Sequence, residues 1–483
     1  MRPVINILEN ELKEKVVTEA IEILEEIGIF IENNEAIEIL QNAGIDVNQE
    51  KNRAKIPADI VRKSIKSAPS SITLFDREGK EVTKLEKENI CFDPGSAALQ
   101  VLDPETNEIR LGVSKDLINF TKVVEQLEYI HAQSTAIICS DVPEVVADRY
   151  RLYLALIYSK KPVITGTFAK ESFEIMKDML VTIRGGEKEL RKKPLAIFDA
   201  CPSPPLKWSD LTCQSIIDGA KYGIPSEFVS MPMTGANAPV TILGAIVQHA
   251  AETLAGIVIT QLVSPRAPVI WGGSPAVFDM RKGTTPMGSI DTMILDLGFV
   301  EIGKYLNFPT HAYLGMSDAK ILDAQTGFET GMGALLAGIK GVNMISGAGM
   351  IDFETTQSIQ KVVIDNEICG MVHKFIKGIT QRDEPIAKHL LKEFDEKTTH
   401  LLSHDHTLKW FKEEQFIPST IIDRSTNEEW INKGRKSIGQ RANERAEKLI
   451  KKYPGVTLEK DIINDLSKIM KYKDVDFKSF LDL

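Results

Sequence analysis

The chain has 483 residues, of which 43% are hydrophobic and 26% are charged, as in globular proteins with a large core. Its net charge of −10 argues against nucleic acid as the main partner. The five cysteines are scattered and none stands in a CxxC pair, which favours reduced thiols over a disulfide framework or a zinc knuckle.

The amino terminus carries acidic residues too early for a signal peptide. The longest apolar stretch, near residues 250–263, is interrupted by Glu252 and Gln261, so we expect no membrane span. These features together predict a cytoplasmic protein.

Residues 1–89 are expected to form a helical segment with one hairpin, packed on the domain that follows. Apolar residues recur at helical spacing from Val17 to Ile27. Residues 72–75 and 81–83 are typical of the two arms of a hairpin. No part of this segment has the residue types of a catalytic site.

From residue 90 onward, short apolar runs alternate with helical patterns. Eight runs begin 31 to 42 residues apart, at residues 90, 130, 162, 195, 226, 267, 309 and 342. Eight such strand–helix alternations predict a (β/α)8 TIM barrel of the α/β class over residues 90–380. An open, doubly wound sheet would give the same alternation, but the first strand lacks the glycine fingerprint of dinucleotide-binding sheets. An inserted hairpin is expected at residues 99–101 and 108–110.

The seventh and eighth units show the pattern most clearly. A helix is expected over residues 319–340 with Ser317 or Asp318 as its cap, so that Lys320 falls in its first turn. The eighth strand ends in the glycine turn of residues 346–349, which can present bare N–H groups.

A long helix is expected over residues 356–379. A polar, mostly helical extension over residues 381–483 follows it. We expect this extension to wrap the barrel or to serve the interface of a homo-oligomer.

Polar and aromatic side chains gather at the ends of the predicted strands, where parallel barrels carry their sites. They are Phe92, Asp93, Gln133, Thr135, Thr165, Thr167, Phe168, Asp199, Cys201, Met231, Met233, Trp271, Tyr313, Ser317, Asp318, Ser346, Asp352, Phe353 and Glu354. Aromatic rings, thioethers and hydroxyls outnumber the carboxylates, which favours a cation-binding site over a hydrolytic pair of acids. Each aromatic face contributes about 0.5–2 kcal/mol to binding of a quaternary ammonium.

Several motifs resemble the trimethylamine methyltransferase family. They are residues 315–329 (GMSDAKILDAQTGFE), 346–350 (SGAGM) and 363–367 (VIDNE), and the tail around His404-Asp-His406 and Trp430. The resemblance runs from about residue 5 to about residue 450. Members are TIM-barrel enzymes that pass a methyl group from a methylated amine to the cobalt of a separate corrinoid protein.

The founding members of this family carry pyrrolysine, whereas this chain has standard residues throughout. Members without pyrrolysine are similar to glycine betaine, proline betaine or carnitine demethylases. The resemblance therefore implies methyl transfer from a betaine-like quaternary amine to the Co(I) of a corrinoid carried by a partner protein, with no tightly bound metal. Because a quaternary nitrogen leaves as a neutral tertiary amine, the chain would act by positioning and needs no catalytic side chain.

The candidate binding residues are chosen from the predicted strand ends, not from known positions of the family. The cage for the ammonium is assigned to Phe92, Trp271, Tyr313 and Phe353, with Asp93 or Asp318 adding negative charge. The substrate carboxylate is assigned to Ser346, His311 and the backbone N–H groups from Gly347 to Gly349.

Two rival functions are left open by the sequence. A barrel lyase or aldolase would use Lys320 as a Schiff-base lysine, or a metal, for which His404 and His406 are a closely spaced pair. A binding protein would keep the pocket for a betaine without transferring its methyl group.

Overall fold

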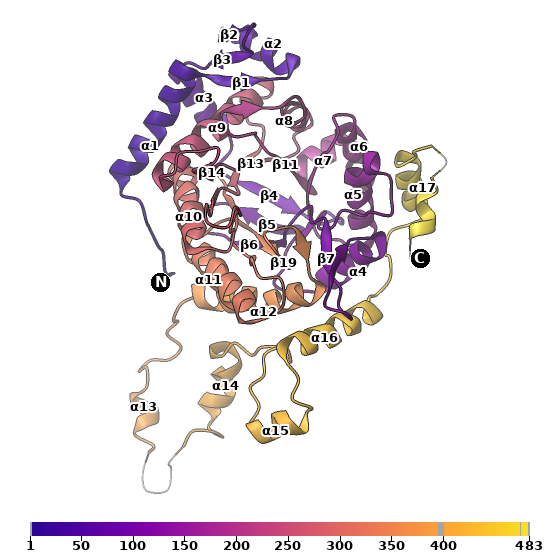
Figure 1. Ribbon diagram of the computed structural model, residues 1–483. Helices are drawn as coiled ribbons and strands as arrows, with labels where there is room; N and C mark the ends of the chain where they lie inside the picture. Colours follow the sequence, from indigo (N-terminus) through magenta and orange to yellow (C-terminus); the bar gives the residue numbers. More distant parts are fainter. Residues whose placement is uncertain (1, 395–399, 474, 482–483) are drawn as a thin grey trace.

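The computed structural model describes residues 2–394, 400–473 and 475–481. Its centre is built of parallel strands with helices between them, as expected for the α/β class (Figure 1). The central strands are β6 (Cys91–Pro94), β9 (Gln133–Ser134), β10 (Val163–Gly166), β11 (Ala196–Ala200), β13 (Ser226–Ser230), β15 (Val269–Gly273), β17 (His311–Tyr313) and β18 (Met344–Ala348).

The central strands form two parallel sheets. One has the order β15-β13-β11-β10-β9 and the other β17-β18-β6. The two ladders are separate, but a backbone hydrogen bond links each pair of neighbouring edges. The Trp271 N–H donates to the Pro309 carbonyl at 2.8 Å, and the His131 N–H donates to the Phe92 carbonyl at 2.8 Å. The fold is therefore an α/β arrangement of parallel strands surrounded by helices (Figure 1).

The helices that follow the strands cover their outer side. They are α4 (Ser114–Glu125), α5 (Ala147–Tyr158), α6 (Ser172–Arg184), α7 (Glu187–Lys192), α8 (Asp210–Tyr222), α9 (Ile242–Val263), α10 (Ile290–Tyr305), α11 (Ala324–Lys340) and α12 (Ile359–Ile376). Among the described residues, only α9 is long and apolar enough to cross a membrane. However, 83% of its apolar window is buried inside the protein, as in the core helix of a globular domain.

Side chains alternate between the two faces of each strand, and one inward-facing row forms an apolar floor. The floor consists of Cys91, Ala132, Ile164, Ile197, Ile270 and Met344. The predicted hairpin is present as β4 (Ile72–Phe75) and β5 (Glu81–Leu85), and its residues Ile72, Leu74 and Leu85 belong to the same cluster. The hairpin thus packs against the amino-terminal half of the strands.

Short strands extend the other, carboxy-terminal ends. The predicted inserted hairpin is confirmed as β7 (Gln100–Leu102) and β8 (Ile109–Leu111), and it joins β19 (Met350–Ile351) and β20 (Thr356–Gln357) in one sheet. A second pair is formed by β14 (Met233–Thr234) and β16 (Ala276–Val277). Loops that carry candidate site residues are therefore tied to one another by backbone hydrogen bonds.

The amino-terminal segment contains strands that the sequence did not reveal. Helix α1 (Asn10–Glu22) runs into a π-helical turn (Ile23–Ile27) that ends at Gly28, whose φ is 77°. A small sheet follows, with α2 (Asn34–Asn42) and α3 (Ala58–Ser67) beside it; its strands are β1 (Ile29–Ile31), β2 (Asp46–Asn48), β3 (Arg53–Lys55) and β12 (Lys207–Trp208). Three-residue strands are too short to show a period of two, which explains the missed strands.

The helix of the seventh unit begins later than predicted. Helix α11 starts at Ala324, because the Asp323 side chain accepts hydrogen bonds from two N–H groups of the first turn. The predicted caps Ser317 and Asp318 are therefore wrong, and Lys320 lies in the loop before the helix.

The carboxy-terminal extension has a projecting part and a packed part. Its helices are α13 (Lys388–Leu391), α14 (Asp405–Glu414), α15 (Asn427–Asn432), α16 (Ile438–Lys452) and α17 (Lys460–Ile469). Helices α14 and α15 bury no residue and stand away from the body in Figure 1. By contrast, α16 and α17 bury apolar side chains, including Leu449 and Leu466.

Candidate functional site

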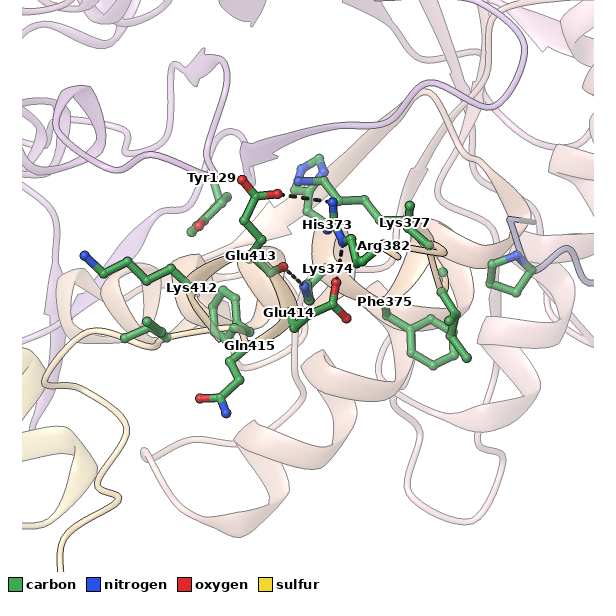
Figure 2. Close-up of a pocket in the computed structure, with 17 residues that line it drawn as sticks. Tyr129, His373, Lys374, Phe375, Lys377, Arg382, Lys412, Glu413, Glu414 and Gln415 are labelled. Carbon is green, nitrogen blue, oxygen red and sulfur yellow. Dashed lines mark hydrogen bonds and ion pairs between the residues drawn. The ribbon is translucent and has the colours of Figure 1, made fainter. Parts of the chain in front are cut away.

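A cleft of about 1110 Å³ lies between the end of α12 and residues 412–417 of the extension (Figure 2). Tyr129 and His373 line it, together with Lys374 and Arg382. Tyr129 precedes β9, so the cleft lies toward the amino-terminal ends of the central strands. Parallel α/β folds, open sheets and barrels alike, carry their sites at the opposite, carboxy-terminal ends of the strands, so the candidate site lies there.

Three carboxyl groups point inward above the apolar floor. Asp93 follows Cys91 by two residues and Asp199 follows Ile197 by two, so both stand one step nearer the carboxy-terminal ends. Glu227 is the ladder partner of Asp199 and faces the same side. Asp93 and Glu227 are each 1% exposed, and Asp199 is half-buried. We call Asp93, Asp199 and Glu227 the acid layer.

A chain of polar contacts links four of the central strands. The Ser346 hydroxyl donates to Asp93 Oδ1 at 2.6 Å and lies 2.9 Å from Nε2 of His311. Nδ1 of His311 lies 2.9 Å from Oε1 of Glu227. Burial lowers the pKa of His311 to about 4 and raises the pKa of Glu227 to about 8. The imidazole is therefore neutral at neutral pH and supplies no positive charge to the acid layer.

The acid layer has fewer hydrogen bonds than buried acids usually receive. Among the described residues, Oδ2 of Asp93, Oδ1 of Asp199 and Oε2 of Glu227 are buried without a hydrogen-bond partner. Burial raises the pKa of Asp93 and of Asp199 well above the usual range, and the charge of Glu227 adds to the effect in both. A cation among these groups would favour their charged forms, so their chemistry suits a cation site.

An apolar layer stands beyond the acid layer, toward the strand ends. It consists of Ala98, Val229, Ala276, Met287, Tyr313, Met316 and Met350, with Cys201 packed against it. The Tyr313 ring stands edge-on to His311, with 5.0 Å between the ring centroids. Thioethers and an aromatic ring offer a polarisable surface to N-methyl groups. The two layers together place buried carboxyl groups beneath a polarisable apolar surface.

Three polar side chains near the two layers keep some accessible surface. Asp199, Cys201 and Glu354 are half-buried. Even so, burial is the main reason that the pKa of Cys201 rises to about 12 and that of Glu354 to about 8. The charges of Asp199, Glu227 and Glu354 all raise the pKa of Cys201, so these groups lie near one another.

Asp318 anchors the loop that carries Met287 and Gly288. Its two carboxylate oxygens accept hydrogen bonds from the N–H groups of Met287 and Gly288, each at 2.9 Å. These bonds fix Met287 in the apolar layer. Glu329 of α11 accepts hydrogen bonds from the Ser317 hydroxyl at 2.6 Å and from the Asp318 N–H at 2.8 Å. The structure thus gives Asp318 an anchoring place rather than a carboxylate free for a ligand.

One face of the Phe353 ring is already covered by another side chain of the protein. The Lys320 ammonium stands 3.7 Å from the ring centroid and 3.4 Å from Oδ1 of Asp352. The same ammonium donates to the Asp318 carbonyl at 2.7 Å. Lys320 therefore holds loops together, and its ammonium occupies the place that a ligand would take on this face.

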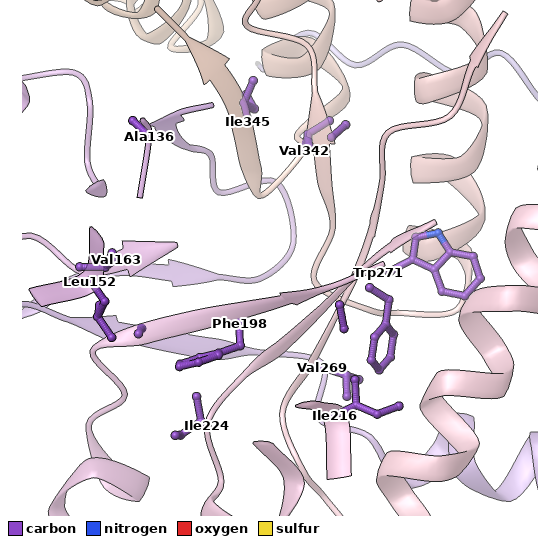
Figure 3. Packing of buried hydrophobic residues seen from close by; sticks show 14 of the residues in the cluster. Ala136, Leu152, Val163, Phe198, Ile216, Ile224, Val269, Trp271, Val342 and Ile345 are labelled. Atoms are coloured by element: carbon purple, nitrogen blue, oxygen red, sulfur yellow. The ribbon is translucent and has the colours of Figure 1, made fainter. Parts of the chain in front are cut away.

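Phe92 and Trp271 are separated from the other candidates. Each occupies an outward position of its strand, next to the inward-facing Asp93 and Gly272 respectively. The Phe92 ring meets His373 of α12 edge-on at 5.6 Å. The Trp271 indole N–H donates to the carbonyl of Phe299 in α10 at 2.9 Å, and Figure 3 shows the ring on the helix side of its strand. The structure therefore does not bring Phe92 and Trp271 together with Tyr313, as the predicted four-ring cage requires.

One of the backbone groups assigned to a carboxylate is already engaged. The Gly349 N–H donates to Asp365 at 2.7 Å, and Asp365 also pairs with Lys361. Gly347 has a φ of 111°, and a Cβ there would lie 3.0 Å from Cβ of Met316. His311 and Ser346, by contrast, contact the acid layer through the chain of contacts above.

Replacing Trp271 with phenylalanine tests this division of the candidates. The variant loses the hydrogen bond to Phe299 and part of a buried ring, so the free energy of unfolding should fall by about 1–3 kcal/mol. The affinity of Trp271→Phe for a quaternary amine should not change. By contrast, Tyr313→Leu should weaken binding by about tenfold, because it removes the aromatic ring of the apolar layer. Chemical denaturation and calorimetric titration measure the two effects. A large loss of affinity in Trp271→Phe would return Trp271 to the site.

Two charged residues near the site were not singled out from the sequence. Glu227 lies in the middle of β13, and its only signal is an acid inside a buried strand. Arg151 of α5 is 1% exposed, donates to the Thr135 carbonyl at 2.6 Å and stacks on Phe168 at 4.5 Å. Its positive charge lowers the pKa of Asp199 and so offsets part of the rise that burial causes. Arg151 is therefore a buried guanidinium close to the acid layer.

The tail histidines form pairs of their own. Nε2 of His404 lies 3.1 Å from Glu393, and Nε2 of His406 lies 3.0 Å from Asp383. Within the described part of the chain, no three or more His, Cys, Asp or Glu side chains are grouped so that they could hold a metal ion.

Comparisons with known proteins identify the family. The trimethylamine methyltransferase (MTTB) family profile matches residues 1–477. Trimethylamine methyltransferase MttB of Desulfitobacterium hafniense (strain DSM 10664 / DCB-2) is 31% identical over 460 residues, covering 95% of this chain and 92% of the relative. The glycine betaine methyltransferase of Desulfitobacterium hafniense (strain Y51) is 28% identical over 462 residues, covering 95% of each chain.

The fold also has a solved counterpart. The Methanosarcina barkeri monomethylamine methyltransferase (MtmB) superposes with a TM-score of 0.54 at 13% identity, covering 93% of this chain and 89% of the other. At that identity the likeness concerns the fold alone. Together with the profile match, which extends over nearly the whole sequence, these similarities show that the chain belongs to the trimethylamine methyltransferase family.

Proposed function

We propose that this protein transfers a methyl group from a quaternary amine to the Co(I) of a separate corrinoid protein. The observation that carries the proposal is the acid layer, in which one oxygen of each carboxyl group lies buried without a hydrogen-bond partner among the described residues, next to a layer of methionines and Tyr313. This arrangement supplies what an N-methylated cation requires, namely negative charge and a polarisable wall. The glycine betaine methyltransferase among the relatives supports a quaternary substrate.

The transfer needs no proton. The N–CH3 bond breaks with its electron pair staying on nitrogen, and an electron pair of Co(I) forms the bond from cobalt to carbon. The chain would therefore act by holding and aiming the substrate. The acid layer would hold the ammonium, while Tyr313 and the methionines would contact the methyl groups that remain. The product is a neutral tertiary amine, so the acid layer would bind it more weakly than the substrate.

A betaine also carries a carboxylate, which needs a positive partner. We assign this role to Arg151, because its guanidinium is buried and its charge acts on Asp199. The chain is composed of standard residues, and we propose that it works without a pyrrolysine adduct. The charge already present on a quaternary nitrogen makes such activation unnecessary.

We also propose that the two parallel sheets form one (β/α)8 barrel. The hydrogen bonds from Trp271 to Pro309 and from His131 to Phe92 support a continuous ring of strands, as does the likeness to MtmB. In this proposal residues 1–89 pack on the barrel of residues 90–380. The extension of residues 381–483 serves a homo-oligomer in the cytoplasm.

An anaerobic assay tests the proposed reaction. The protein is mixed with a corrinoid protein reduced to Co(I) and with glycine betaine, proline betaine or carnitine, and the corrinoid absorbance is followed. We expect loss of the Co(I) spectrum and one equivalent of demethylated amine with at least one of these substrates. Trimethylamine serves as the comparison and should react far more slowly. If no quaternary amine is demethylated in a protein-dependent manner, the proposal is wrong.

A further inference from the structure

The turn after β19 has an unusual backbone. Asp352, Phe353 and Glu354 have φ values of 52°, 56° and 68°. None of them is glycine, and the left-handed region crowds the Cβ of an L-residue against the following carbonyl. Three such residues in a row persist only where surrounding contacts hold them, and strain of this kind gathers at functional sites. The turn is therefore a place to look for function.

Contacts from the neighbouring loop hold the turn in place. The Asp352 N–H donates to the Ala319 carbonyl at 2.9 Å. Next to this bond, the Lys320 ammonium binds the Asp352 carboxylate and covers the Phe353 ring, at the distances given above. The loops that follow β17 and β18 are thus clasped together. We call Lys320, Asp352 and Phe353 the clasp.

The clasp holds Glu354 beside the carboxy-terminal end of β15. Oε1 of Glu354 accepts a hydrogen bond from the Ser274 hydroxyl, which follows β15, at 3.2 Å. The charge of Glu354 helps to raise the pKa of Cys201 and of Tyr313. The charges of Asp199 and Glu227 raise the pKa of the same two residues. Tyr313 and Cys201 therefore lie near both Glu354 and the acid layer.

We propose that Glu354 is a further substrate-binding residue, which holds the ammonium from the loop side while the acid layer holds it from below. Lys320 is then a positioning residue, because it keeps the turn in the conformation that points Glu354 inward. This inference rests on the proposed function and adds a second source of negative charge to the same site. It also explains why the ring of Phe353 is covered by a lysine of the chain itself.

Substitution of Glu354 by glutamine tests the inference. The amide keeps the size of the side chain and its contact with Ser274 but removes the charge. The affinity for glycine betaine should fall by at least about tenfold, because a desolvated charge loses its partner. The affinity for 3,3-dimethylbutanoate, which has carbon in place of nitrogen, should not change. In the corrinoid assay KM should rise while kcat stays within about twofold of the wild-type value.

Companion variants separate charge from folding. Glu354→Asp restores the charge and should recover part of the lost affinity. Lys320→Met removes the ammonium but keeps the length of the stem, so it should weaken glycine betaine binding less than Glu354→Gln does. Glu105→Gln removes an exposed acid in the β7–β8 hairpin and should match the wild-type protein. Melting temperatures identify any variant that is simply unfolded.

The possible results separate the two proposals. If the wild-type protein demethylates glycine betaine and Glu354→Gln binds it equally well, the role of Glu354 is overturned and the proposed function stands. Equal losses of affinity for glycine betaine and for its neutral analogue would also overturn that role, because they would indicate a structural effect. If the wild-type protein demethylates no quaternary amine, the proposed function fails, and the role of Glu354 fails with it.

Discussion

Replacing Asp199 and Glu227 together by their amides should weaken the binding of a quaternary amine by at least about 100-fold. The side chains keep their size, and the site loses two of the three charges of the acid layer. Removing one partner of a buried charge pair costs about 2–5 kcal/mol. Removing two carboxylates should therefore weaken binding by at least the 100-fold stated above. Calorimetric titration with glycine betaine measures it directly, without the corrinoid protein.

The same double variant should have the opposite effect on stability. At about pH 8 the ligand-free protein has to bury a partly charged Glu227, whose Oε2 has no hydrogen-bond partner among the described residues, and the amide at this position removes that cost. The double variant should therefore unfold at a higher temperature than the wild-type protein, although it binds more weakly. Structural damage would lower both quantities.

Glu252 provides a matched control for the double variant. It is also a fully buried acid, but its oxygens accept hydrogen bonds from Leu206, Ser230 and Gln248. Glu252→Gln should therefore lower the melting temperature and leave the affinity unchanged. If the Asp199 and Glu227 double variant binds glycine betaine as the wild-type protein does, the acid layer is not the cation site.

The sequence predicted the helices and strands of the core because its units are long and strongly periodic. It could not predict which face each strand turns inward. Both faces of a parallel strand are buried, so apolar residues occupy inward and outward positions alike. Phe92 and Asp93 are neighbours in β6, yet one packs on α12 and the other lies in the acid layer. A one-residue shift in register moves a side chain to the other face.

The roles of the loop residues depend on contacts between distant segments. The motif around Ser317, Asp318 and Lys320 is typical of a helix start, and only the structure shows that Asp323 caps the helix instead. Asp318 anchors residues 287–288, which lie 30 positions earlier along the chain. The left-handed turn at Glu354 has no local signal, because none of its residues is a glycine. Such features follow from tertiary packing and cannot be derived from local preference.

Binding of a quaternary amine should become tighter as the pH rises from about 6 to about 8. In the ligand-free protein, burial raises the pKa of Glu227 to about 8 and that of Asp199 well above its usual range. Glu227 is therefore largely protonated at about pH 6, and a bound cation favours its charged form. Each proton released on binding makes the affinity rise by up to about tenfold per pH unit below the pKa.

Proton release can be measured by calorimetric titration in buffers of different ionisation enthalpy. Wild-type protein should release protons when glycine betaine binds near about pH 7, and Glu227→Gln should release fewer. Glu354, whose pKa is also raised to about 8, should contribute to the release, whereas His311, with a pKa of about 4, should remain neutral throughout. An affinity that does not vary with pH, with no proton exchanged, would contradict a buried acid layer as the binding site.

The stability of the ligand-free protein should depend on the same buried acids. It should fall as the pH rises, whereas the affinity for a quaternary amine should increase. An acid whose pKa is higher in the folded state than in the unfolded state stabilises the fold at low pH, and this stabilisation is lost as the pH rises through the folded-state value. For Glu227 the window runs from its ordinary value of 4.5 to about 8, which corresponds to as much as about 5 kcal/mol. The melting temperature without ligand should therefore fall between about pH 6 and about pH 8, and the increase caused by glycine betaine should grow over the same interval. Both trends should weaken in Glu227→Gln, because the amide does not titrate. The cation then has one carboxylate fewer whose negative charge it can stabilise.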